Sequence, residues 1–164
     1  MKFKAVDEIH QFSFEDSEIQ ELKIEGEKVE FTFNGATVKA GNSQNGRYQN
    51  MYCGTIILQL ENATIARIVK EGMKYYDANG ALLSEVPDED VPAPAKGNVL
   101  ERCKKGTVFT AVEDKVAEGY AYEFGIDVPG EEDEEEVDTF WLCIVFEHSV
   151  AMWDKYVSPT EGEN

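Results

Sequence analysis

An uninterrupted apolar run, Phe140–Phe146, stands out in the second half of the chain. In a β-strand alternate side chains face opposite sides, so the four even-numbered residues would cover one face and the three odd-numbered residues the other. Seven residues are too few for a typical buried helix, and β-forming residue types dominate the run. It therefore predicts a central strand covered by apolar material on both faces, with Cys143 as a small core residue.

Alternation of apolar and polar residues predicts further strands. The clearest case is 120–128, where Tyr, Phe, Ile and Val occupy the even positions and small or acidic residues the odd ones. Residues 29–33 alternate in the same way, as expected of a half-solvated antiparallel strand. Residues 107–113 predict another strand, and residues 8–14 read as the first strand of the chain.

One interruption of this pattern predicts a bulge. Ile19, Leu22 and Ile24 are spaced by three residues and then by two, so a regular strand cannot place them on one face. An extra residue near Gln20-Glu21 would restore the phase.

Two short polar breaks predict hairpins. Asn62 separates apolar alternation at 55–60 from a second apolar segment at 65–69, and a hairpin is the simplest arrangement. Within 75–83, Asp77 and Gly80 occupy the first and fourth positions that a type I turn favours. Tyr75 stands where an EF-hand loop would need an acid, so this turn is not such a calcium loop.

Prolines and helix-capping residues indicate the structure of the segments between the predicted strands. Residues 86–97 contain three prolines and no apolar period, which predicts a surface crossover between two β-rich halves. Residues 98–106 carry the signals of a short helix, with Asn98 as its N-cap and Gly106 beyond its end. After Ser149 the pattern is compatible with either of two structures, a final helical turn or a bent edge strand.

These elements predict a mainly β fold: an antiparallel β-sandwich or a strongly curved sheet or partial barrel, with one or two short helices. The chain of 164 residues fits one domain. We expect a single β-rich domain over 1–159, with the Pro-rich crossover at 86–97 and an acidic hairpin loop at 130–138. Residues 160–164 are expected to fray.

Charge is the strongest feature of the composition. The chain has 33 acids against 15 bases, a formal net charge of −18. The segment 85–139 holds 17 acids and 5 bases, which gives −12 of that total. Such a field repels nucleic acid and anionic lipid. It serves solubility, or attracts a basic protein or weakly held divalent cations.

The sequence indicates neither a membrane span nor secretion. No run reaches the roughly 18 apolar residues of a membrane helix, and the opening residues lack the apolar core of a signal peptide. Three widely separated cysteines, Cys53, Cys103 and Cys143, favour neither disulfides nor zinc. We therefore expect a cytoplasmic protein.

The common catalytic motifs are missing from the sequence. It has only two histidines, His10 and His148, and no nucleophile elbow, P-loop or dinucleotide fingerprint. Glu123 and Asp127 would share a strand face at a separation of about 13 Å, too far for a glycosidase pair. We therefore expect no enzymatic activity, no catalytic residues, no metal site and no cofactor.

An amide-rich segment at 41–50 offers the clearest ligand-binding chemistry. Side-chain amides donate and accept hydrogen bonds, and a tyrosine adds a flat apolar face, which suits a polyhydroxylated or peptide ligand. The alternative is a long ordered loop whose amides bind their own backbone. The candidate ligand-binding residues are Asn42, Gln44, Asn45, Arg47, Tyr48 and Asn50.

Three short patterns carry a family resemblance. Phe14-x-Asp16-Ser17-x-Ile19 followed by Gly26 resembles the opening of small, β-rich, uncharacterised bacterial proteins, some of them associated with toxin immunity. The stretches 74–80 and 153–156 are similar to uncharacterised proteins of Gram-positive bacteria. The resemblance implies an immunity-like protein of bacterial origin and assigns no activity or site residue.

Two functions follow as hypotheses. The first is a non-enzymatic cytoplasmic binding or interaction protein, immunity-like, whose acidic surface meets a basic protein. The alternative is a module that binds a small polar, saccharide-like ligand through the loop 42–50. Neither nucleic acid nor membrane is an expected partner, and the chain is expected to be a monomer or a homodimer.

Overall fold

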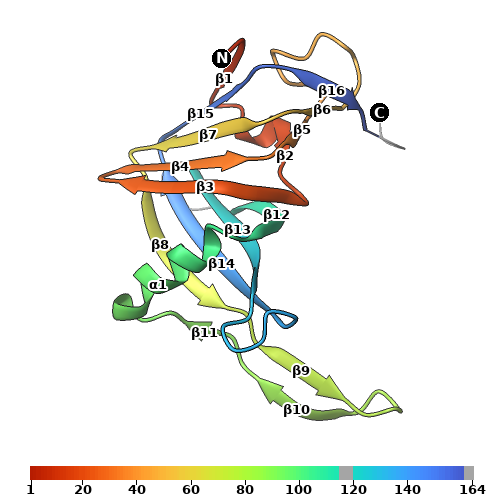
Figure 1. The fold of residues 1–164 in the computed structure, drawn as a ribbon, viewed down its shortest axis with the longest axis vertical. Helices are drawn as coiled ribbons and strands as arrows, with labels where there is room; N and C mark the ends of the chain where they lie inside the picture. The colour runs from red at the N-terminus through yellow and green to blue at the C-terminus, as the bar shows by residue number, and fades with distance from the viewer. Residues whose placement is uncertain (115–119, 161–164) are drawn as a thin grey trace.

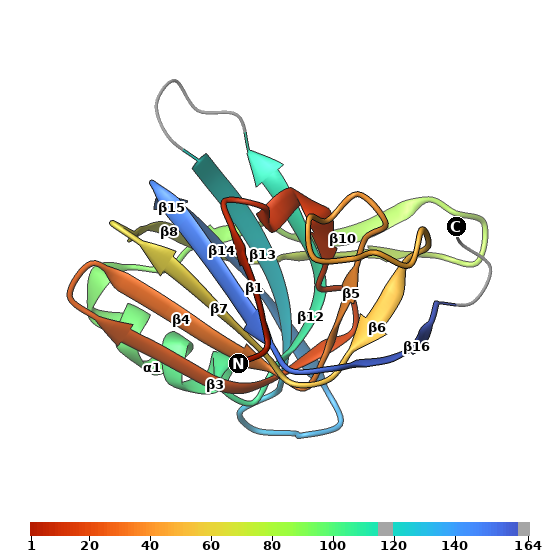
Figure 2. The same cartoon turned by 90° about the horizontal axis from the view of Figure 1, so that it is seen from above.

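The computed structural model describes residues 1–114 and 120–160, and it is built almost entirely of antiparallel strands (Figures 1 and 2). A 3-10 turn spans Ile9–Gln11, and one helix, α1, spans Ala93–Cys103. The strands are β1 (Phe3–Val6), β2 (Phe12–Ser13), β3 (Ser17–Glu25), β4 (Lys28–Phe33), β5 (Ala36–Val38), β6 (Met51–Cys53), β7 (Ile56–Glu61), β8 (Thr64–Lys70), β9 (Met73–Tyr76), β10 (Leu82–Val86), β11 (Glu89–Asp90), β12 (Thr107–Asp114), β13 (Tyr120–Pro129), β14 (Val137–Phe146), β15 (His148–Trp153) and β16 (Tyr156–Pro159).

The main sheet has ten strands in the order β1-β15-β7-β4-β3-β12-β13-β14-β8-β11. Its two halves meet where the start of β3 pairs with the start of β12, and there the sheet bends so that the halves face each other (Figure 2). The two ends of this strand order, β1 and β11, are not paired with each other in the described structure. The predicted mainly β, sandwich-like fold is confirmed, and the sheet is not a closed barrel.

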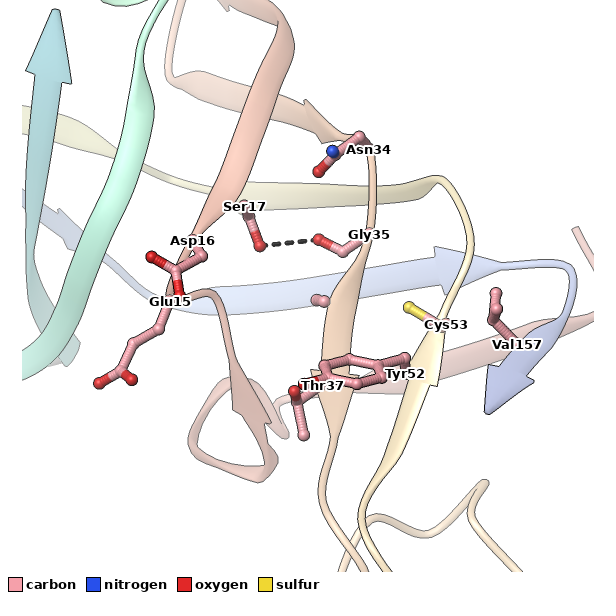
Figure 3. A pocket seen from close by; sticks show the side chains of 10 residues that line it. Glu15, Asp16, Ser17, Asn34, Gly35, Thr37, Tyr52, Cys53 and Val157 are labelled. Carbon is pink, nitrogen blue, oxygen red and sulfur yellow. Dashed lines mark hydrogen bonds between the residues drawn. The ribbon is translucent and has the colours of Figure 1, made fainter. Parts of the chain in front are cut away.

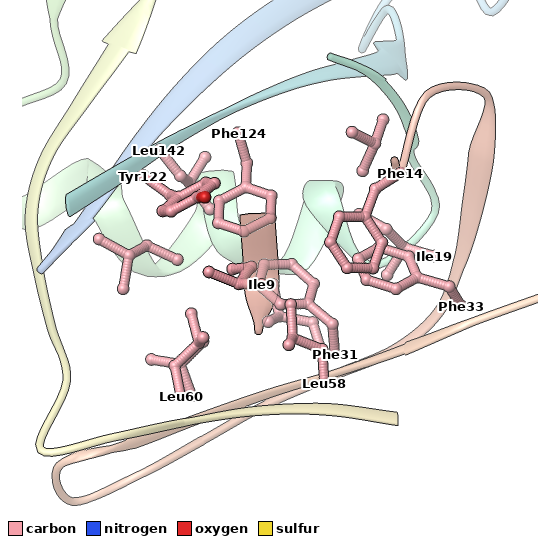
Figure 4. Close-up of a cluster of buried hydrophobic side chains, with 14 of the residues drawn as sticks. Ile9, Phe14, Ile19, Phe31, Phe33, Leu58, Leu60, Tyr122, Phe124 and Leu142 are labelled. Atoms are coloured by element: carbon pink, nitrogen blue, oxygen red, sulfur yellow. The ribbon is translucent and has the colours of Figure 1, made fainter. Parts of the chain in front are cut away.

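The core fills the space between the two halves (Figure 4). Phe31 of β4 and Phe124 of β13 are both fully buried, with ring centroids 5.0 Å apart. Leu58 and Leu60 approach from β7, and Leu142 from β14. A smaller sheet, β16-β6-β5-β2, and helix α1 complete the body.

Strand β14 has the central position that the apolar run predicts, between β13 and β8. Its even-numbered residues from Phe140 to Phe146 are buried. The odd-numbered residues are only half-buried, so the expectation of two covered faces is wrong for the outer one. There Trp141 packs edge-on against Phe109, which also lies where a side chain at Gly125 would project. Cys143 lies on this outer face and is not a core residue. The run is apolar on both faces of the strand, but the core covers only the face with the even-numbered residues.

Two local predictions at the start of the chain have different outcomes. The β3–β4 register shifts between Ile19 and Glu21, which confirms the bulge near Gln20. The single strand expected at 8–14 is wrong. There the chain forms a 3-10 turn that buries Ile9, followed by β2, and the first strand is β1.

The hairpin predicted around Asn62 is also wrong. Strand β7 pairs with β4 and β15, whereas β8 pairs with β14 and β11. Asn62 has a positive φ of 50°, a conformation that asparagine tolerates better than most residues. The chain turns a corner here and passes from one half of the sandwich to the other.

The helix and the C-terminal strands differ from the predicted boundaries. Helix α1 begins at Ala93 after Pro92, so the crossover expected over 86–97 includes β11 and the first helical turns, and Asn98 is not the N-cap. Pro94 lies in the first turn of α1. Proline is well suited to this position, because the backbone N–H that it lacks would have no partner within the helix. Beyond Ser149 the chain forms β15 and β16 rather than a helix, and β15 is an interior strand. Most of the tail expected to fray, 161–164, lies outside the described residues.

Candidate functional site

The β9–β10 hairpin, residues 73–86, extends away from the body of the molecule (Figure 1). Every residue of both strands is exposed. Yet the hairpin is rich in large apolar side chains, and exposed apolar surface of this kind marks interaction sites. Its exposed apolar residues are Met73, Tyr75, Tyr76, Leu82, Leu83 and Val86.

The turn of this hairpin is well formed, as its sequence predicts. The Gly80 N–H donates to the Asp77 carbonyl at 3.1 Å, and Gly80 has a φ of +82°. The Asp77 carboxylate accepts from the N–H groups of Asn79 and Ala81 at 2.8 and 2.9 Å. At the base, a Cβ on Gly72 would overlap the carbonyl of Val86, so glycine allows the close crossing of the strands. The shape of the hairpin is thus fixed by hydrogen bonds within its own turn, from the backbone and from the Asp77 carboxylate.

A groove of about 640 Å³ lies between the base of the hairpin and the start of β14. We call it the hairpin groove. Met73, Tyr75 and Val86 line it from the hairpin and Val137 from β14. Its charged lining residues are Lys70, Glu71, Glu136 and Asp138, and Lys70 lies 3.9 Å from Asp138. The groove therefore combines an apolar wall with a rim of three acids and one lysine.

The loop between β13 and β14 contributes Glu136 to this rim. Arg102 of α1 binds Glu131 at 3.2 Å and Asp138 at 2.6 Å and so anchors both ends of the loop. Among the described residues, no Lys or Arg side chain forms an ion pair with the run 132–136, five consecutive acids that we call the acidic run. Glu136 of this run lines the groove, whereas Glu134 lines a separate hollow beside α1. Together the five carboxylates give this end of the molecule a negative field that attracts a cationic ligand.

The predicted amide residues serve largely to hold their own loop. The Asn45 amide donates to the carbonyls of Val38, Lys39 and Gln49 at 2.9–3.1 Å. Asn42 and Asn45 are buried. These bonds are those expected of the ordered-loop alternative.

The other members of the predicted set point in different directions. Asn50 accepts from the Ala40 N–H at 2.9 Å, and Arg47 lies over the Tyr156 ring at 5.7 Å. Gln44 is exposed, and Tyr48 is 93 % exposed. The structure brings the asparagines together in the loop but does not converge the six side chains on one cavity described here. Ligand binding at this loop stays a prediction.

A second hollow, of about 320 Å³, lies between β3 and the small sheet (Figure 3). Glu15, Asp16 and Tyr52 line it, and the Ser17 hydroxyl there donates to the Gly35 carbonyl at 2.7 Å. Cys53 also lines it, but burial raises the pKa of this thiol to about 11. A thiol protonated at neutral pH is a poor nucleophile, so this hollow offers no catalytic group of that kind.

Three potential metal ligands meet on the outer face of the main sheet. One ligand atom each from Asp114, Glu123 and Cys143 lies within 4.8 Å of the others, so the three could hold a metal ion. Burial, with Glu123 and Asp114 nearby, raises the pKa of the Cys143 thiol. A thiol must lose its proton to bind a metal, so this environment disfavours the ligand form of Cys143.

His148 forms an ion pair with Asp7 at 3.0 Å. The hydrogen bond that the His148 ring donates to the Asp7 carboxylate, and then the charge of that carboxylate, raise the pKa of His148. Burial opposes ionisation of Asp7, but the Ser149 N–H and His148 outweigh it, and the pKa of Asp7 is lowered. The pair is therefore fully charged between the lowered pKa of Asp7 and the raised pKa of His148.

This pair predicts a pH-dependent contribution to stability. Because the His148 pKa is raised by folding, its contribution is complete below the unfolded-state pKa of histidine as long as Asp7 is ionised, and it is lost as the pH rises through the folded-state pKa. We expect the difference in unfolding free energy between wild type and His148→Gln to shrink between pH 5.5 and pH 9, as measured by urea denaturation. Asp7→Asn, which keeps an oxygen for the Ser149 N–H, should remove the same dependence. A difference independent of pH in this range would contradict it.

No protein-family model, curated protein or solved structure matches this chain. No helix in the described part is both long enough and apolar enough to cross a membrane.

The turn of the projecting hairpin was predictable from the sequence, but its exposure was not. One signal was available: apolar residues occur on both faces of this short hairpin, where a surface hairpin normally keeps one face polar. The position of Glu136 at the base of the hairpin could not be predicted, because residues 73–86 and 136 are far apart in the sequence.

Proposed function

We propose that this is a non-enzymatic binding protein whose projecting hairpin and acidic run together hold a basic segment of a partner protein. The supporting observation is the exposure of every residue in β9 and β10, including six large apolar ones, next to Glu136, the last residue of an acidic run that forms no ion pair with any described Lys or Arg. An isolated two-stranded hairpin is marginally stable in water, so such a surface gains much from a partner that covers it.

The charge selects the chemistry of the partner. Lysine and arginine carry apolar stems that can lie along Tyr75 and Val137 while their cationic heads reach Glu136. A second copy of this chain would bring the same acids against one another. An immunity-like role, in which the protein neutralises a basic partner by covering it, is the form of this function that we favour.

Peptide display tests this proposal without a known partner. A library of random 12-residue peptides is selected on the wild-type chain, and the binders are measured against Met73→Ser/Tyr75→Ser/Val86→Ser. We expect selected peptides to be enriched in Lys and Arg. The triple variant should bind them at least tenfold more weakly, because it removes the apolar wall of the groove. Its melting temperature should stay close to that of wild type, since all three side chains are exposed.

Tyr48→Ser is the matched control, because it removes an exposed tyrosine from the amide-rich loop. It should leave peptide binding unchanged, and binding by wild type should weaken in high salt. Acidic or neutral peptides, or peptides that bind the triple variant as well as wild type, would contradict the proposed function. A loss caused by Tyr48→Ser would favour the loop 42–50 instead.

A further inference from the structure

Strand β9 has one unpaired edge. In the described structure it pairs only with β10. Strand β8, which leads into β9, has β14 on one side and β11 on the other. Because β10 leads directly into β11, it occupies the β11 side of β9. The other edge of β9 therefore lies on the side where β14 runs beside β8.

The hairpin groove lies at the base of the hairpin, next to the start of β14. Strand β14 begins at Val137, and the backbone N–H of Glu71 still donates to Thr139 there at 2.8 Å. Beyond that point β9 continues without β14. The groove there is lined by Met73, Tyr75 and Val86 of the hairpin, by Glu136 and Val137 next to them, and by the charged residues Lys70, Glu71 and Asp138. A further strand beside β9 would continue the sheet past the start of β14. Neighbouring strands lie about 4.8 Å apart, so an extended segment needs only a narrow groove.

Strand β9 is short, with four residues, but its edge lacks the other usual protections against pairing. Edge strands in proteins are commonly short, charged or interrupted by proline. Strand β11 fits that description, with only Glu89 and Asp90. Strand β9 has no proline, and its one charged residue, Lys74, is paired with Glu85 of β10 at 4.0 Å. The contrast indicates that β9 is suited to accept a strand.

We propose that the partner binds as an extended, basic strand added to the free edge of β9, with alternate side chains in the hairpin groove. Main-chain hydrogen bonds would supply affinity, and the groove would supply specificity for apolar and cationic side chains. This inference rests on the proposed function and adds the conformation of the bound segment.

N-methylated peptides test the inference. The probe is the eight-residue peptide (Lys-Val)₄, blocked at both ends, and two derivatives are N-methylated at every Lys or at every Val. In a strand the N–H groups of alternate residues point to opposite edges, so each derivative loses the donors of one edge only. Titration by isothermal calorimetry gives the three dissociation constants. Strand addition uses one edge, so one derivative should bind like the parent and the other at least tenfold more weakly.

The outcomes separate the two proposals. Amide hydrogen exchange of residues 73–76 should slow when the parent peptide binds. Equal binding of both derivatives, whether strong or weak, would overturn strand addition; if the parent still needs Tyr75, the proposed function stands. A parent peptide that does not bind, or binds the Met73→Ser/Tyr75→Ser/Val86→Ser variant as well as wild type, would overturn both.

Discussion

Leu142→Ala is expected to lower the free energy of unfolding by about 2–5 kcal/mol, the usual cost of removing a fully buried leucine side chain. Leu142 lies on β14 and has no exposed surface, and Leu58 has the same burial on β7, in the opposite half of the sandwich. Both contribute to the core cluster drawn in Figure 4. We therefore expect Leu58→Ala to cost a similar amount.

Urea denaturation followed by circular dichroism measures this effect. Each variant should show one transition, shifted as a whole, because the two halves share a single core. Leu83→Ala is the matched control: this leucine is 68 % exposed, and its loss should change stability by no more than about 0.5 kcal/mol. Two separate transitions, with one variant affecting only one of them, would show that the halves fold independently.

Arg102→Ala is expected to destabilise the protein by about 2–3 kcal/mol, because charge-assisted hydrogen bonds are lost at a largely covered site. The Arg102 side chain is 14 % exposed. It donates to Asp138 at 2.6 Å, to Glu131 at 3.2 Å and to the Pro129 carbonyl at 2.9 Å. Its guanidinium also lies 5.2 Å from the centroid of the Phe140 ring. Removing it frees α1 from both ends of the acidic loop.

Arg102→Lys separates charge from geometry. Lysine keeps the positive charge but cannot bind three acceptors through a planar fork, so it should recover only part of the lost stability. Thermal unfolding of the three proteins at one pH gives the comparison. Full recovery by lysine would mean that the charge alone matters, and no loss in Arg102→Ala would mean that the loop does not depend on α1.

The features that the sequence predicted well depend on neighbouring residues. The spacing of Ile19, Leu22 and Ile24 requires a bulge whatever strand lies alongside, and the bulge is present. Asp77 and Gly80 specify their turn through bonds within five residues. Such elements form for reasons contained in a short window of sequence.

The features that the sequence did not predict depend on distant partners. A corner and a hairpin show the same apolar alternation on either side of Asn62, and only the pairing of β7 with β15 and of β8 with β14 distinguishes them. Likewise, the apolar run 140–146 does not reveal that one of its faces lacks a covering layer. The exposure of the projecting hairpin was not predictable for the same reason. It depends on whether another part of the chain packs against the two strands, and none does in the described structure.

The position of β15 has a consequence for how the chain reaches its final form. This strand, residues 148–153, lies between β1 and β7, which are made much earlier during synthesis. Until it arrives, β7 presents an open flank and β1 has no neighbour. Pairings across so many residues slow folding and leave strand edges available to other chains. We therefore expect the first half of the sandwich to be completed late in folding, after residues 148–153 are available to pair.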